Sequence, residues 1–227
     1  MPRTARASAG GVCYHVMNRG NGRATVFLDA ADYAAFVDLI GEACRRVPMR
    51  VLAFSLMPNH FHLALWPHED GDLGRWMQWL LTSHVRRHHR RHGGSGHVWE
   101  GRFKAFPAQS DRHLLSLLRY IERNPVRAKL VKRAEQWAWS SLGWSNRPKA
   151  GDPKAIAFLS RGPVPRPENW LEWVNQPQSD EELAALRRSV NRGTPLGGEA
   201  WSRRIAEQLG LESTLRPRGR PRKKPEK

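Results

Sequence analysis

Apolar and polar residues follow one another along the first half of the chain with two different periods. Four segments are predicted to be strands: residues 11–18, 50–56, 60–66 and the region around 102–106, with apolar, β-prone and alternating residues from Phe61 onward. Apolar residues recur at helical spacing from Tyr33 to Val47, and again from Leu73 to a stop at Gly93. Asp29 and Asp72 are expected to cap these two helices.

The resulting order is β-α-β-β-α-β, which predicts an α+β fold of the ferredoxin-like type. In this topology an antiparallel sheet carries two helices on one face, and the first and third strands lie at its centre. The strand that begins at His60 is therefore expected to be a central, well-ordered platform.

A third helix is predicted after the sheet unit, from Asp111 to Asn124, with Ser110 as its cap and Pro125 as its end. Its buried stripe is expected to comprise Leu114, Leu117, Leu118 and Ile121. Tyr120 and Asn124 lie one turn apart on one flank of this stripe, together with His113.

Changes in composition divide the chain into four regions. Residues 1–145 form the predicted main domain, and residues 146–167, rich in Pro, Gly and basic residues, form a linker. Helices at about 180–190 and 199–209, the latter followed by Gly210, predict a small helical region over 168–212. Residues 213–227 are expected to be a disordered basic tail.

The formal charge of the chain is +17, and much of it is concentrated in two basic runs, residues 84–92 and 215–227. Concentrated positive charge favours a polyanionic partner, most commonly nucleic acid, although a solvated surface is the alternative. The two cysteines lack zinc-type spacing. Because the chain also lacks a long apolar run and an apolar signal core, we expect a cytoplasmic protein, associated with the nucleoid and not with a membrane.

His60 and His62 are the first candidates for chemistry, because a strand places both on one face together with Ala64 and Trp66. Two imidazoles side by side can bind one metal ion; the alternative is a pair of hydrogen-bonded sheet histidines. If the metal lies beside the third helix, Tyr120 can attack a phosphodiester and Asn124 can add an amide oxygen. Such a ligand set suits exchangeable Mg²⁺ or Mn²⁺.

The segment His60-Phe61-His62 resembles the HUH motif (histidine, hydrophobic, histidine) of the single-tyrosine HUH endonucleases. The strings MPNHFHLAL, GRFKA, YIERNPVRAKLV and WAWSSL resemble the REP-associated tyrosine transposases, over roughly residues 10–145. The resemblance implies a metal-dependent transposase in which His60 and His62 bind the metal, Tyr120 is the nucleophile and Asn124 assists the metal. It also implies single-stranded DNA next to hairpins as substrate, a 5′-phosphotyrosine intermediate and strand transfer. Mobile relatives commonly have Gln where Asn124 stands, so a water-mediated contact with the metal is the alternative to direct coordination.

The predicted DNA contacts come from three regions of the sequence. They are Arg19, Arg102 and Lys104 beside the predicted site; Arg86, Arg87, Arg90 and Arg91 in the first basic run; and Arg218, Arg220, Arg222 and Lys223 in the tail. The tail contains an Arg-Gly-Arg-Pro string that an A·T minor groove can accept, or else it binds without sequence preference. His15 and His113 are interpreted as ordinary packing histidines.

Two other functions remain open on the sequence alone. One is a catalytically inert protein that binds repeat hairpins, and the other is a hydrolase that uses metal-activated water instead of Tyr120. The sequence does not decide between a monomer and a homodimer.

Overall fold

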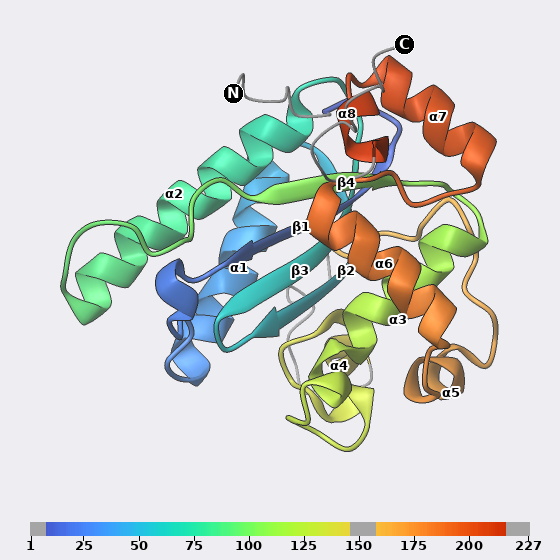
Figure 1. Ribbon diagram of the computed structural model, residues 1–227. Coiled ribbons are helices and arrows are strands. Elements are labelled where there is room, and N and C mark those ends of the chain that lie inside the picture. Colours follow the sequence, from blue (N-terminus) through green and yellow to red (C-terminus); the bar gives the residue numbers. More distant parts are fainter. Residues whose placement is uncertain (1–7, 146–157, 217–227) are drawn as a thin grey trace, which may run out of the picture.

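The computed structural model describes residues 8–145 and 158–216. At its centre lies a four-stranded sheet in the order β2-β3-β1-β4, with every neighbouring pair antiparallel (Figure 1). Its strands are β1 (Cys13–Arg19), β2 (Met49–Met57), β3 (His60–Pro67) and β4 (Lys104–Ala108). The predicted ferredoxin-like order is confirmed, with β1 and β3 at the centre.

Two long helices cover one face of the sheet: α1 (Ala30–Arg46) and α2 (Asp72–His92) (Figure 1). The main apolar core lies beneath them, because alternate strand residues such as Val16, Phe61 and Leu63 point to this side and are fully buried. Asp29 caps α1 as predicted, since its side chain accepts hydrogen bonds from the amides of Ala31 and Asp32.

The opposite face of the sheet is covered by α3 (Arg112–Arg127), which packs mainly on β2 and also contacts β3 and β4. The predicted apolar stripe of this helix is confirmed, because its four members are buried: Leu114, Leu117, Leu118 and Ile121. The sheet therefore lies between two helical layers, and α3 faces the side of β3 that carries His60 and His62.

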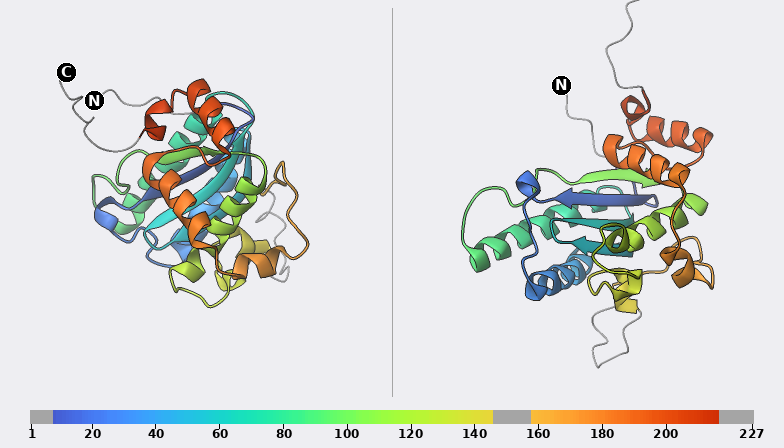
Figure 2. Two further views of the ribbon diagram at one scale, coloured as in Figure 1. Left: turned by 45° about the vertical axis from the view of Figure 1, so that its right-hand side comes forward. Right: turned by 60° about the horizontal axis from the view of Figure 1, so that its bottom comes forward.

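Short elements connect these layers: η1 (Asn21–Arg23), η2 (Ala134–Gln136) and α4 (Ser141–Ser145). Beyond them come α5 (Trp170–Asn175), α6 (Asp180–Arg192), α7 (Glu199–Gln208) and α8 (Glu212–Leu215). The two helices predicted in this region are confirmed as α6 and α7, and Gly210 follows α7 with a φ of +66°. The views in Figure 2 show this part of the chain lying against α3 and β4.

Two predicted caps are wrong by one residue. Gly71 precedes α2 with a φ of +84°, whereas Asp72 lies inside the first turn and accepts hydrogen bonds from Glu69 and Arg75. The cap of α3 is Asp111, whose carboxylate accepts from the His113 amide.

The predicted end of α3 is also wrong. Pro125 lies inside the helix, which continues to Arg127. A proline removes one amide donor, but here it falls in the last turn, where the Ala128 amide still reaches the Asn124 carbonyl. The extra turn adds Arg127 to the helix.

The fourth strand is shifted by two residues from its predicted position. Pairing with β1 sets its register, with Met17 opposite Lys104 and Cys13 opposite Ala108. No helix in the described ranges is long and apolar enough to cross a membrane.

Candidate active site

The two candidate histidines, His60 and His62, lie at the start of β3 on the face that α3 covers. Arg19 lies opposite His60 and Met17 opposite His62 in the pairing of β1 with β3. Ala64, two residues further along the same face, packs in the apolar cluster under α3. The prediction that His60 and His62 share a face is therefore confirmed, and this face looks toward the third helix.

Each of the two imidazoles is held by its Nδ1 atom. His60 Nδ1 lies 2.7 Å from Asn59 Oδ1, and His62 Nδ1 lies 2.8 Å from Nε2 of His15. Among the described residues, neither Nε2 atom has a hydrogen-bond partner. In the tautomer in which Nδ1 carries the proton, each Nε2 presents a lone pair to the site.

The electrostatics favour neutral imidazoles. Burial, together with the nearby positive charges of Arg127 and Arg19, lowers the pKa of His60 from 6.5 to about 4. Burial, then the neighbouring His15, His60 and Arg127, holds the pKa of His62 well below its ordinary value. Because a metal ion needs a deprotonated nitrogen, these imidazoles are ready to bind one at neutral pH.

His15, set aside by the sequence as a packing residue, is part of this cluster. It is fully buried on β1, and its ring stacks on that of His62 with centroids 5.0 Å apart. Burial, followed by the charge of Arg127, lowers the pKa of His15 to about 3. Its hydrogen bond fixes the orientation of the His62 ring. Hydrogen bonds of this kind also orient the histidines of metal sites.

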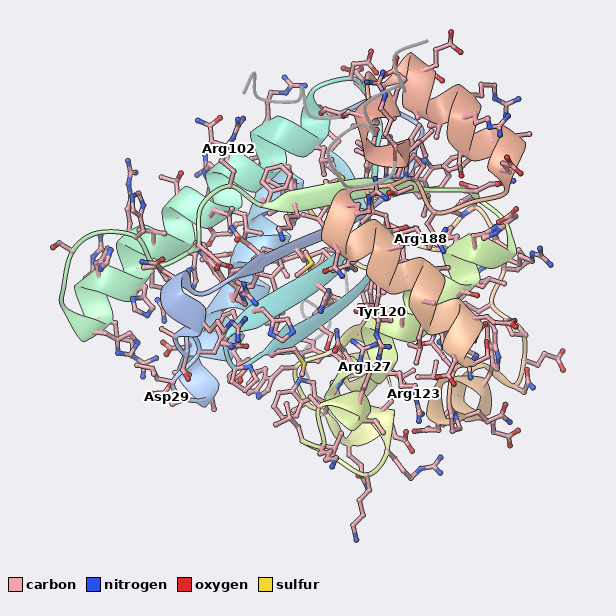
Figure 3. All side chains as sticks on the ribbon, viewed as in Figure 1. Asp29, Arg102, Tyr120, Arg123, Arg127 and Arg188 are labelled. Carbon is pink, nitrogen blue, oxygen red and sulfur yellow. The ribbon has the colours of Figure 1, made fainter. Side chains whose placement is uncertain are left out.

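Tyr120 projects from α3 toward the histidines (Figure 3). Its ring centroid lies 5.8 Å from that of His62 and 6.3 Å from that of His15, edge-on in both cases. The residue is only 5% exposed, and no hydrogen bond joins its hydroxyl to a described residue. The third helix of this chain thus brings a phenol to the histidine pair of the same chain.

Asn124 lies one turn beyond Tyr120, and its side-chain oxygen accepts a hydrogen bond of 2.8 Å from Arg127. The guanidinium of Arg127 lies over the Tyr120 ring, with Cζ 4.0 Å from the ring centroid. The buried Nδ2 of Asn124 has no partner among the described residues. Arg127 was not predicted as a site residue, since α3 was expected to end before it.

Arg102 and Lys104 border a cleft of about 340 Å³ beside β1 and β4, whose lining also includes Asn18 and Asn191. Arg19 lines the same cleft, where Glu100 pairs with it at 2.7 Å. This cleft adjoins the histidine face, because Lys104 lies opposite Met17 and Met17 lies opposite His62.

The basic run at the end of α2 divides into two groups. Arg86, Arg87 and Arg90 are exposed, whereas Arg91 makes ion pairs with Asp29 and Asp32 at 2.6 and 2.7 Å. The tail candidates lie outside the described residues: Arg218, Arg220, Arg222 and Lys223. His113 is bonded to Asp111 at the start of α3 and is not part of the cluster around Tyr120.

The fit of these residues to a metal can be judged from their donors. Over residues 8–145 and 158–216, no group of three or more His, Cys, Asp or Glu side chains is arranged to hold a metal ion. Two neutral imidazoles remain, His60 and His62, beside an amide oxygen that already accepts from Arg127. Such a partial set fits a divalent ion whose other positions are filled by water and substrate oxygens.

Residues 8–124 match the model of the family described as "Transposase IS200 like". The chain belongs to this family. The match contains the histidine pair, Tyr120 and Asn124, and it ends before Arg127 and before all of the C-terminal helices.

Two relatives illustrate what the chain is similar to. A REP-associated tyrosine transposase of Haemophilus influenzae is 26% identical over 112 residues, which cover 44% of this chain and 63% of the relative. The solved structure of a REP-associated tyrosine transposase bound to a REP hairpin has a TM-score of 0.52 and 21% identity, covering 71% of this chain and 98% of the other. The second likeness confirms the α+β fold of the chain.

Proposed function

We propose that the protein cleaves and rejoins single-stranded DNA at hairpin-forming repeats, through a covalent bond between Tyr120 and a 5′-phosphate. One observation carries the proposal: Tyr120 and His62 face each other across one site of one chain, with ring centroids 5.8 Å apart. Support for the DNA substrate comes from family membership and from the hairpin bound to the structural relative.

The bond changes are those of a phosphoryl transfer. Tyr120 Oη forms a bond to phosphorus while the bond from phosphorus to the 3′-oxygen breaks. The phenolic proton passes to water, and the departing 3′-oxygen takes up a proton from water. An incoming 3′-hydroxyl reverses these events, so that the stored ester is rejoined to a second strand.

His60 and His62 would hold Mg²⁺ or Mn²⁺ through their Nε2 atoms, with Asn124 as a further donor through the unused lone pair of its oxygen. When bound there, such an ion would supply Lewis-acid stabilisation of charge on the phosphate oxygens. Asn59 and His15 keep the two imidazoles in place, because each engages an Nδ1 atom and leaves the Nε2 atom of that ring available.

The DNA backbone would pass along the cleft beside β4. Arg102 and Lys104 line this cleft, and Arg19 could exchange its partner Glu100 for a phosphate. The exposed Arg86, Arg87 and Arg90 offer a second cationic surface at the end of α2. A hairpin adjoining the cleaved strand would have both surfaces available.

One assay separates this function from its competitors. End-labelled single-stranded DNA with a hairpin is incubated with Mn²⁺ and wild-type protein, Tyr120→Phe or Tyr33→Phe, and then run on a denaturing gel. Tyr33 is the matched control, because it is also buried but lies on α1. We expect a covalent adduct with wild type and Tyr33→Phe, none with Tyr120→Phe, and none when the metal is chelated.

The other outcomes identify the alternatives. Cleavage that persists in Tyr120→Phe would show a hydrolase that uses activated water. Tight binding of the hairpin by wild type without any cleavage would show an inert DNA-binding protein.

A further inference from the structure

Three arginines of α3 differ sharply in what they contact. Arg119 donates to the backbone carbonyls of Gln176 and Pro177, and Arg123 donates to those of Val174 and Asn175. These two arginines hold the C-terminal region against the helix. Arg127 is hydrogen-bonded to none of these carbonyls. Its side chain lies over Tyr120 instead, as the labelled side chains in Figure 3 show.

The guanidinium of Arg127 has N–H donors that no described residue uses. One of its five N–H donors is used by the side-chain oxygen of Asn124, and no carboxylate pairs with it among the described residues. The residue is exposed, whereas the Tyr120 ring beneath it is buried. A planar cation with free donors at the mouth of a site matches the geometry of a phosphate.

The charge of Arg127 acts on every imidazole of the cluster. It contributes to lowering the pKa of His15, His60 and His62, which places its positive potential within the site itself. These imidazoles are neutral at neutral pH. The guanidinium therefore supplies positive charge where the phosphate oxygens and the Tyr120 oxygen become more negative during reaction.

Resting on the proposed function, we propose that Arg127 is a catalytic residue that binds the scissile phosphate and stabilises negative charge on the oxygen of Tyr120. Asn124 is then a positioning residue, because its side-chain oxygen holds the guanidinium above the ring. In cleavage, negative charge develops on the Tyr120 oxygen as its proton passes to water, and it moves to the departing 3′-oxygen as the Oη–P bond forms and the P–O3′ bond breaks. In rejoining, Tyr120 leaves as a phenolate that takes a proton from water, so Arg127 stabilises the same oxygen in both directions.

The first test compares single-turnover rates of adduct formation and of rejoining in wild type, Arg127→Gln and Arg112→Gln. Arg112 is the matched control, since it begins the same helix and is exposed. We expect Arg127→Gln to slow both steps by about 100-fold or more, as loss of a charge-stabilising donor does elsewhere. Arg112→Gln should react at the wild-type rate.

A second measurement separates catalysis from structural damage. Calorimetric titration of the DNA-free protein with Mn²⁺ should show tighter binding in Arg127→Gln, because a repelling charge beside His60 and His62 is removed. A disrupted site would bind Mn²⁺ more weakly than wild type. Slower chemistry together with tighter metal binding is the signature of the proposed role.

Asn124→Ala provides the third arm. At saturating Mn²⁺, where a contribution of Asn124 to metal binding no longer limits the rate, the rates of the double variant Arg127→Gln/Asn124→Ala should equal those of Arg127→Gln alone. Multiplied losses in the double variant would overturn the positioning role of Asn124. Adduct formation at the wild-type rate by Arg127→Gln would overturn the catalytic role of Arg127, whereas absence of adduct in wild type would overturn the proposed function instead.

Discussion

Replacing Glu122 by glutamine tests how α3, the helix that carries Tyr120, is held in place. Glu122 lies two residues after Tyr120 and is fully buried on α3. Its carboxylate accepts hydrogen bonds from Ser141 Oγ at 2.7 Å, Trp170 Nε1 at 2.7 Å and Arg166 at 3.0 Å. These donors come from three segments outside α3, so this one carboxylate joins the helix to α4, to α5 and to the segment before α5.

The loss of unfolding free energy in Glu122→Gln depends on which of the three hydrogen bonds an amide can still make. If the NH₂ group of the new glutamine faces Ser141, the Ser141 hydroxyl can accept a hydrogen bond from this group. The same hydroxyl can then donate its own hydrogen to the Phe54 carbonyl at 3.3 Å. The indole of Trp170 then keeps an acceptor, and Arg166 loses one. A hydrogen bond to a charged group contributes about 1.5–3 kcal/mol. Because the Arg166 side chain is 32% exposed and water can replace part of the loss, we expect about 1–2 kcal/mol.

Urea unfolding followed by circular dichroism measures this change in the free energy of unfolding. In a thermal scan the melting temperature should fall by about 2–8 °C for a chain of this size. Glu207→Gln, on an exposed position of α7, is the control and should match wild type. In an Arg166→Met background, Glu122→Gln should cost much less than in wild type. An equal cost in both backgrounds would refute the assignment of the loss to the Arg166 pair.

Three further predictions concern other parts of the molecule. Burial, and next the charge of His88, lowers the pKa of His84 from 6.5 to about 3, so the unfolded chain takes up this proton at a higher pH than the folded chain. The free energy of unfolding should therefore fall as the pH drops from 6.5 toward 3, and urea titrations should show a smaller fall in His84→Met. Asp29→Ala removes the cap of α1 and a partner of Arg91, and should lower the free energy of unfolding by about 1–2 kcal/mol, with the exposed Asp38→Ala as control. Lys104→Gln should reduce the slope of log affinity against log salt by about 0.7 for single-stranded DNA in a filter-binding series, and an unchanged slope would remove Lys104 from the interface.

The parts of the site that the sequence predicted correctly depend on local periodicity. Two-residue alternation placed His60 and His62 on one face, and helical spacing placed Tyr120 and Asn124 on one flank. Both rules hold because the strand is central and the helix is strongly amphipathic. Neither rule requires knowledge of which segments meet in space.

The features that the sequence missed depend on where segments meet, or on a competing local signal. The bond between His15 and His62 arises from the register of two strands that are 47 residues apart, which no local pattern specifies. The place of Arg127 on α3 was not predicted because Pro125 indicated that the helix ends before it. The helix in fact tolerates this proline in its last turn. The Arg166–Glu122 pair joins residues 44 apart across a segment that was expected to be a linker.

The buried carboxylate of Glu122 also bears on how the chain can be divided. A fragment that stops at residue 145 would keep Ser141 but lose Arg166 and Trp170, two of the three donors to Glu122. It would also uncover the apolar side of α3 against which Trp170 and Val174 are buried. The shortest fragment that folds by itself should therefore extend through α5, well beyond the residues that match the transposase family.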